Sequence, residues 1–407
     1  MEKYKLVIVG GGAAGLMAAI SASEAGLKSV ALLEGSSRLG TKILMSGGSR
    51  CNVTNETVTP DNFFGGSRNF IKNVLRAFSD KDAFQFFRRL GVELKLEAGG
   101  KYFPSDDRAS SVLNALLKKA QELGVKIFLS SKVEDIDFNG SSFTLSCRNN
   151  KFQAEKVILT TGGMSYPSTG SDGTGYRLVK KLGHTIKEPM PALTPILLNE
   201  PGLTSLSGIT IPARLMLTQN EKKLIEVENS LLFTHFGISG PAALNISREV
   251  VRLRKENVKL KLNFIPSLNE ESLSVLLKSQ IRQSSEKSVL NFFREMLPQN
   301  LCNVLFGLAE VSTEKKFYSL SKEEMRRLVR TFTAYELRFT GVKGFRQAEV
   351  TSGGVLLDEV RYQTMESRIQ KGLFLAGEIL DADGIIGGYN FQWAWATGFI
   401  AGKSSSL

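Results

Sequence analysis

The amino-acid sequence predicts an α/β protein built on a mainly parallel sheet, and its N-terminal segment carries the main evidence. Residues 6–9 form a continuous apolar run, as expected of a strand buried on both faces of a parallel sheet. A glycine-rich turn and an alanine-rich helical pattern follow, and a second apolar run ends at Glu34. The order strand, turn, helix, strand is the repeating unit of doubly wound α/β folds.

The turn has the spacing Gly-x-Gly-x-x-Gly, in which each glycine has a physical role. Gly10 allows the tight turn, Gly12 lets a pyrophosphate approach the backbone, and Gly15 lets helix and strand pack closely. The helix that follows directs its free N–H groups at the phosphates, and Glu34 stands where a carboxylate binds a ribose. This Rossmann-type unit is therefore expected to bind an ADP-containing dinucleotide through Gly10, Gly12, Ala13, Ala14, Gly15, Glu34 and Gly35.

A second cofactor motif lies close to the C-terminus. Residues 371–376 form an apolar strand that ends in Gly377-Glu378, and a glycine-rich turn and a helix from about residue 391 follow. Binding by a first-strand turn and a last-strand acid suits FAD, which stretches across the carboxyl edge of the sheet. We expect non-covalent FAD. No second complete Gly-x-Gly-x-x-Gly unit is found, so NAD(P)H is expected to reach the flavin only transiently, as electron donor.

The segment 35–55 is rich in glycine and serine. Between Ser46 and Asn52, small residues surround Arg50, a composition that suits backbone passing close to a flat or phosphorylated ligand, with Lys42 as a further charge partner. A surface loop is the alternative. Downstream, apolar periodicity predicts helices at 70–90, divided near Ser79, and at 109–123, and a three-stranded meander within 132–153 inserted into the parallel sheet.

Composition limits the partners and the compartment. The formal net charge of +12 favours an anionic partner such as nucleic acid or an acidic metabolite, although a solvated basic surface is an equal alternative. The three cysteines form no closely spaced pair, which fits a reducing cytoplasm and excludes a dithiol reductase. Two histidines, His184 and His235, are too few for a histidine-rich metal centre, and no apolar run is long enough to cross a membrane.

The pattern of elements predicts three domains. Three prolines between residues 189 and 195 mark a boundary, after which short strands continue to about residue 265, helices to about 330, and strands again near 340. The predicted FAD-binding domain comprises 1–190 and 345–407, a β-domain comprises 191–265 and 331–344, and a helical insert comprises 266–330. The insert has an excess of basic residues, and Arg252, Arg254, Lys255, Lys259 and Lys261 precede it. These cations either contact a polyanion or form a solvated face.

Five stretches carry a resemblance to a known family: residues 42–55, 160–175, 234–241, 348–355 and 377–398. Over nearly its whole length the chain resembles the BaiN/RdsA-type family of NAD(P)/FAD-dependent oxidoreductases, also called the aminoacetone oxidase family. The resemblance implies a glutathione-reductase-like Rossmann FAD domain interrupted by a β-barrel substrate domain that carries a helical insertion. Ser49 stands where the family usually has glycine, which affects the expected geometry of that loop only.

The resemblance also implies which residues contact FAD. The ribityl and flavin part is expected to lie along Lys42, Ser46, Gly47, Gly48, Arg50, Cys51 and Asn52, with adenine at the backbone of Val133. Thr161 and Gly162 are expected to close the cofactor, Glu378 and Asp381 to lie near the ribityl chain, and the pyrimidine end to meet Gly387, Gly388, Tyr389 and Asn390. Gly163, Gly377 and Phe391 are further expected cofactor contacts. Cys51 has either a redox role or the role of a small buried side chain.

The family's activities include reduction of enones in steroid-like acids, reduction of uridine in ribosomal RNA, and amine oxidation. We expect hydride transfer from reduced FAD to an activated C=C bond of a small molecule, with a nearby acid supplying a proton. The alternatives are a dihydrouridine-forming reductase that acts on structured ribosomal RNA, an amine oxidase that uses oxygen, and a non-catalytic flavin-bound redox sensor. Candidates for the polarising or protonating group are His235, Tyr166, Tyr389 and Arg50. His235 could instead form a hydrogen bond between domains.

Overall fold

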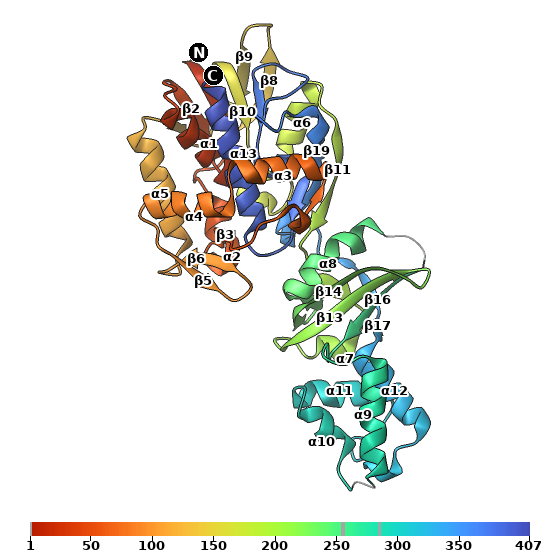
Figure 1. Ribbon diagram of the computed structural model, residues 1–407. Coiled ribbons are helices and arrows are strands. Elements are labelled where there is room, and N and C mark those ends of the chain that lie inside the picture. Colours follow the sequence, from red (N-terminus) through yellow and green to blue (C-terminus); the bar gives the residue numbers. More distant parts are fainter. Residues whose placement is uncertain (1, 254–256, 284–285) are drawn as a thin grey trace. The chain divides into compact units, whose positions relative to one another are not determined.

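The computed structural model describes residues 2–253, 257–283 and 286–407, and it divides into two compact units. Unit 1 comprises residues 1–191 and 349–407, and unit 2 comprises 192–348. Figure 1 shows both units, with the N- and C-terminal ends of the chain in unit 1. Each unit has its own hydrophobic core. The division of the chain into three domains at the expected boundaries stays a prediction.

The sheet of unit 1 confirms the predicted α/β class. Its strand order is β7-β2-β1-β10-β9-β8, and β20 pairs with β10. The strands β7, β2, β1, β10 and β20 are parallel, while β8, β9 and the first part of β10 form the predicted antiparallel meander. Their bounds are β1 Glu2–Val9, β2 Val30–Leu33, β7 Lys126–Phe128, β8 Val133–Phe138, β9 Phe143–Cys147, β10 Lys151–Leu159 and β20 Leu373–Leu375.

Two helices from opposite ends of the chain pack side by side in unit 1: α1 Ala13–Glu24 and α13 Tyr389–Ser405 (Figure 1). Glycines on α13 allow the close approach. A Cβ atom at Gly398 would lie 2.5 Å from the Ala14 carbonyl oxygen, and one at Gly402 would lie 2.2 Å from the Ala18 carbonyl oxygen. The fully buried Trp393 and Trp395 of α13 fill the core beside this contact.

The remaining elements of unit 1 surround the sheet and form small sheets of their own. The predicted helices at 70–90 and 109–123 are found. The first region is divided at Ser79, which accepts a hydrogen bond from the Asp82 amide at the start of its second helix. The helices are α2 Thr41–Ser49, α3 Arg68–Ala77, α4 Asp80–Arg89, α5 Ala109–Glu122 and α6 Thr174–Lys181. The strands are β3 Thr54–Asn55, β4 Phe63–Gly65, β5 Leu94–Glu97, β6 Lys101–Pro104, β11 Ile186–Ala192, β19 Val350–Val355 and β21 Ala382–Gly384.

Unit 2 contains a seven-stranded antiparallel sheet in the order β17-β16-β13-β14-β15-β12-β18. Its strands are β12 Ile196–Leu198, β13 Thr210–Gln219, β14 Lys222–Thr234, β15 Gly237–Ser239, β16 Val258–Asn263, β17 Tyr335–Leu337 and β18 Phe339–Val342. Its helices are α7 Pro201–Thr204, α8 Gly240–Arg252, α9 Glu270–Arg282, α10 Val289–Arg294, α11 Gln299–Leu308 and α12 Lys322–Thr333. Closure of the sheet into a barrel stays a prediction.

The sequence analysis missed α8, which lies within a segment expected to contain only strands. Pro241 stands at the start of this helix, where a missing N–H costs nothing. Ala242, Ala243, Ile246 and Val250 then place buried apolar groups at helical spacing. The error arose because the short strands on either side were extended through a segment whose period is helical.

Candidate active site

The three glycines of the first turn have different surroundings. Gly10 has φ +107°, and a Cβ atom there would lie 2.5 Å from the Thr160 carbonyl oxygen. At Gly15 a Cβ atom would lie 1.9 Å from the Gly10 carbonyl oxygen, whereas at Gly12 it would meet nothing within 4 Å. Gly10 and Gly15 are therefore required by the fold itself, while Gly12 borders open space at the start of α1.

The carboxylate of Glu34 is held at the end of β2 by two backbone amides. Gly11 N–H donates to Oε2 at 2.8 Å, and Ser36 N–H donates to Oε1 at 2.7 Å. Because a carboxylate has about four acceptor positions, both oxygens can also accept from ribose hydroxyls. Ser131 N–H donates to the Glu34 carbonyl at 2.7 Å, which brings the start of β8, and hence Val133, beside this acid. The structure thus places the predicted ribose and adenine contacts together.

Helix α2 is interrupted by an unusual turn. Gly47, Gly48 and Ser49 have φ of 56°, 68° and 68°, so three consecutive residues are left-handed. A Cβ atom at Gly48 would meet nothing within 4 Å, so this turn also borders open space. The left-handed region costs a residue other than glycine about 1–2 kcal/mol, so the backbone at position 49 favours glycine over the serine found there. Such strain is concentrated at functional sites.

We expect Ser49→Gly to stabilise the protein, because glycine adopts the left-handed conformation without the penalty that a Cβ atom brings. The free energy of unfolding should rise by about 1 kcal/mol, equivalent to about 2–4 °C in Tm. Thermal unfolding monitored by circular dichroism measures the change. Ser110→Gly is the control, because Ser110 is exposed on the regular helix α5, where glycine weakens the helix. Equal Tm values for Ser49→Gly and wild type would show that the left-handed backbone at Ser49 does not destabilise the protein.

Cys51 and Arg50 follow this turn and have structural surroundings. Cys51 is fully buried, and burial raises the pKa of its thiol to about 12, so little thiolate forms near neutral pH. This favours a small buried side chain over a redox role. The Arg50 guanidinium donates to Glu97 at 2.8 Å and to Asp107 at 3.1 Å, and it lies 4.1 Å from the centroid of the Phe103 ring. Two carboxylates therefore already balance its charge, and a catalytic role for Arg50 stays a prediction.

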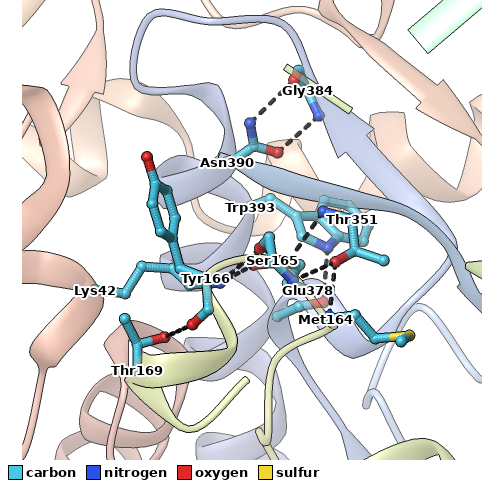
Figure 2. A network of polar contacts seen from close by, with 11 residues as sticks. Lys42, Met164, Ser165, Tyr166, Thr169, Thr351, Glu378, Gly384, Asn390 and Trp393 are labelled. Atoms are coloured by element: carbon cyan, nitrogen blue, oxygen red, sulfur yellow. Dashed lines mark hydrogen bonds and ion pairs between the residues drawn. The ribbon is translucent and has the colours of Figure 1, made fainter. Parts of the chain in front are cut away.

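A hydrogen-bonded network joins four segments that are far apart in the chain (Figure 2). The Lys42 ammonium donates to Glu378 Oε2 at 2.7 Å and to Ser165 Oγ at 2.9 Å. Glu378 Oε1 accepts from Ser165 Oγ at 2.5 Å and from the Thr351 amide at 3.0 Å. Thr351 Oγ1 in turn accepts from the amides of Met164 and Ser165. The sequence analysis missed Ser165 and Thr351 as site residues, although both lie in stretches that carry the family resemblance.

The loop before α13 is fastened by side chains, so that the backbone amides at the helix start stay in place. The Asn390 side chain accepts from Gly384 N–H at 2.8 Å and donates to the Gly384 carbonyl at 3.0 Å. Asn55 Nδ2 donates to the Gly387 carbonyl at 3.0 Å. Gly387 and Gly388 have positive φ, and the buried Tyr389 packs edge-on against Phe63. The Asn390 side chain therefore stabilises the loop. The backbone N–H groups in the first turn of α13 remain available to donate hydrogen bonds.

Two buried polar atoms of the expected FAD contacts test whether the site fits the cofactor. Within the described residues, Asn52 Oδ1 and Thr161 Oγ1 have no hydrogen-bond partner. An unsatisfied buried polar group costs about 1–3 kcal/mol, and a ligand rich in hydroxyl and phosphate groups can satisfy both. Asn52 Oδ1 lies 2.9 Å from where a Cβ atom would stand at Gly388, beside the start of α13. The residues present therefore fit FAD.

A family model described as the HI0933-like protein Rossmann domain matches residues 4–404. The chain belongs to the HI0933-like family. This confirms the resemblance stated above, and it makes the protein a flavin-dependent oxidoreductase that binds FAD. When bound, FAD would supply hydride transfer. Gly12 and the start of α1 would hold its pyrophosphate, Glu34 its ribose, and the first-turn amides of α13 its pyrimidine end, and these roles stay predictions.

Similar proteins of the HI0933-like family match this chain from end to end. A 3-dehydro-bile acid delta(4,6)-reductase of Clostridium scindens is 32% identical over 405 residues, which cover 99% of each chain. Ribosomal RNA dihydrouridine synthases of Escherichia coli and Haemophilus influenzae are 32% and 33% identical, and the matches cover 100% of each chain. Among solved structures, the open conformation of a flavocytochrome c3 fumarate reductase has a TM-score of 0.50 at 16% identity, covering 100% of this chain and 78% of that one, which shows a shared fold alone.

Two other predicted catalytic residues, Tyr166 and His235, and one predicted cofactor contact, Asp381, lie in different surroundings. Tyr166 follows Ser165 of the network and has a left-handed backbone, with φ 48° and ψ 65°. Burial and the nearby Glu349 carboxylate raise the pKa of its hydroxyl. His235 belongs to unit 2, where it is exposed in the turn between β14 and β15 and its ring lies edge-on to that of Phe236. Asp381 is buried and forms an ion pair with Lys187 at 3.0 Å. Their roles in catalysis or FAD binding stay predictions.

The basic run before the helical segment is largely neutralised within unit 2. Arg252 is paired with Glu249 at 2.6 Å, Lys259 with Glu221 at 2.6 Å, and Lys261 lies 3.8 Å from Glu221. Arg254 and Lys255 lie outside the described residues. The described part of this run therefore favours a solvated face over a polyanion-binding surface.

No helix in 2–253, 257–283 or 286–407 is both long and apolar enough to cross a bilayer. Across the same ranges, no three or more His, Cys, Asp or Glu side chains are grouped so that they could hold a metal ion.

Proposed function

We propose that this protein reduces a carbon–carbon double bond conjugated with a carbonyl group, with NAD(P)H as the donor that reduces its FAD. The observation that carries the proposal is the chemistry shared by its full-length relatives. One is named as a delta(4,6)-reductase of a 3-dehydro bile acid and two as dihydrouridine synthases. The delta-4 bond of a 3-oxo acid and the C5=C6 bond of uridine are both activated by a carbonyl group, so the same hydride chemistry serves both.

The geometry of unit 1 supports a flavin used for hydride transfer. The first-turn amides of α13 and its dipole favour negative charge, which develops at the pyrimidine end of the flavin when it is reduced. A nicotinamide would bind transiently, because the chain has a single complete dinucleotide-binding turn. The three cysteines are free thiols, as suits the reducing cytoplasm in which we expect the protein to act.

Ribosomal RNA is a second candidate substrate, favoured by the two dihydrouridine synthase relatives and by the net charge of +12. A positive protein attracts a polyanion over long distances, and the attraction weakens as salt rises. A base must leave its stack to reach a flavin, so an RNA substrate also requires an exposed uridine.

Anaerobic oxidation of the reduced enzyme tests the proposal. Holoenzyme reduced with NADPH or NADH is mixed with a 3-oxo-delta(4,6) steroid acid or with ribosomal RNA from a strain that lacks the gene. We expect one of them to reoxidise the flavin and to gain two hydrogens, measured by flavin absorption and mass spectrometry. The proposal would be wrong if neither substrate reoxidised the flavin. An oxidase would be indicated instead if air rapidly reoxidised the reduced enzyme with formation of peroxide, and if an amine sped up reduction of the flavin.

A further inference from the structure

The side chain of Asn55, the second residue of β3, joins three backbone segments of unit 1. Its Nδ2 donates to the Gly387 carbonyl at 3.0 Å and to the Gly99 carbonyl at 3.0 Å. Its Oδ1 accepts from the Thr57 amide at 3.3 Å. Asn55 is buried, and these partners use both of its donors and its acceptor. They also fix the orientation of the amide group, because a reversed amide would set its oxygen against two carbonyl oxygens.

Strand β3 and the residue before it are also fixed to the first turns of α13. Thr54 Oγ1 donates to Gln392 Oε1 at 2.8 Å, and Trp395 Nε1 donates to the Val53 carbonyl at 2.9 Å. Gln392 and Trp395 are fully buried. These bonds hold the helix itself, whereas Asn55 holds the turn that precedes the helix.

That turn, at Gly387 and Gly388, lies directly against the same segment of chain. Both glycines have positive φ, of 132° and 96°. A Cβ atom at Gly388 would lie 2.6 Å from the Thr54 carbonyl oxygen and 2.9 Å from Asn52 Oδ1. The Asn52 oxygen is buried and has no hydrogen-bond partner within the described residues, so an acceptor beside the turn is left for a ligand.

The bond from Asn55 sets the direction of an amide that Asn55 does not touch. A peptide unit is planar and trans, so its C=O and N–H groups point in opposite directions. By holding the Gly387 carbonyl, Asn55 therefore directs the Gly388 N–H away from itself. The amides of Tyr389 and Asn390 follow, and as first-turn amides of α13 they have no partner within the helix. All three N–H groups lie at the end of α13 where the helix dipole favours negative charge.

We propose that Asn55 is a positioning residue for flavin reduction. By fixing the peptide between Gly387 and Gly388, it makes the site bind reduced FAD more tightly than oxidised FAD, which raises the reduction potential. A hydride from NAD(P)H brings two electrons and one proton, so the donor ends as NAD(P)⁺ and the flavin gains one negative charge. A donor held in place stabilises this charge without reorienting, whereas a free peptide can turn its carbonyl oxygen toward it. The inference rests on the expected place of the pyrimidine end and does not depend on which substrate is reduced.

The test compares Asn55→Ala and Asn55→Ser with the wild type as FAD-loaded proteins. Neither substitution adds a charge. Alanine removes all three hydrogen bonds, whereas serine can still accept from the Thr57 amide but is too short to reach Gly387. We expect the reduction potential, measured anaerobically against a reference dye, to fall in both variants. The expected loss of preference for reduced FAD is about tenfold, equivalent to about 30 mV for a two-electron couple.

Titration of the apo-protein with oxidised FAD gives a second readout. Because binding and reduction are linked, the potential falls only if reduced FAD loses more affinity than oxidised FAD. A matched control is Asn263→Ala, because Asn263 of unit 2 is also buried, donates to the Leu268 carbonyl at 2.7 Å and accepts from the Ile265 amide at 2.8 Å. This variant should lose stability but keep the wild-type potential and affinity for FAD.

Several outcomes would overturn the proposal. One is a wild-type potential in Asn55→Ser, which means that both forms of FAD lose affinity equally and that Asn55 is merely structural. Another is a variant that is folded by circular dichroism but binds neither form, and a third is loss of the fold in both variants. None of these measurements uses a substrate. Failure of the steroid acid and of ribosomal RNA to reoxidise the flavin would therefore refute the proposed function and leave this inference standing.

Discussion

Gly12→Val should produce a folded protein that lacks FAD. Gly12 has φ −83°, which valine tolerates, and a Cβ atom there meets nothing within 4 Å, so the fold has room for the side chain. The pyrophosphate is expected in that space, and the added methyl groups would occupy it. We expect the affinity for FAD to fall by more than about 100-fold, equivalent to about 2.8 kcal/mol.

Flavin absorption of the purified protein measures FAD content, and circular dichroism confirms that the variant folds. Gly307→Val is a matched control, because a Cβ atom at Gly307, on α11, also meets nothing within 4 Å. That variant should retain FAD. Gly10→Val should fail differently, by losing the fold, because its Cβ atom would overlap the Thr160 carbonyl group. A full complement of FAD in Gly12→Val would refute the assignment of this turn to the pyrophosphate.

Glu378→Gln should have the second large effect, because it removes the counter-charge of Lys42. The ammonium group would face an amide where it now donates to a carboxylate at 2.7 Å. Because the Lys42 side chain is 25% exposed, water can solvate its ammonium group and offset part of the lost ion-pair energy. We expect the free energy of unfolding of the apo-protein to fall by about 1–3 kcal/mol, with weaker binding of FAD as the network loosens.

A double-mutant cycle with Lys42→Met separates this pair from the rest of the network. Denaturant unfolding of the two single variants and the double variant should give a coupling energy of about 0.5–3 kcal/mol. Glu228→Gln is the control, because Glu228 also pairs at 2.7 Å, with Arg214, but is more exposed, so less than about 1 kcal/mol is expected. Strict additivity of Lys42→Met and Glu378→Gln would mean that the ion pair adds nothing to stability.

Local chemistry explains which parts of the site could be predicted from the sequence. Gly10, Gly12 and Gly15 lie within one short turn, so their spacing alone predicts the close backbone approach at Gly10 and Gly15 and the open space at Gly12. The alternation of apolar strands and helices predicted the α/β class, because that pattern too depends on residues close together in the sequence. Helix α8 was missed because short strands and helices are hard to separate where apolar runs are brief.

By itself the sequence determined the dinucleotide turn, Glu34 at the end of β2, and the second cofactor motif before α13, since each depends on neighbouring residues. Only the tertiary structure decided that Lys42 pairs with Glu378 and that Arg50 is balanced by Glu97 and Asp107. The order of the strands brings such residues together across hundreds of positions, and no local pattern encodes that order. Desolvation likewise depends on surrounding protein, so the acidity of a side chain emerges only when the chain has folded.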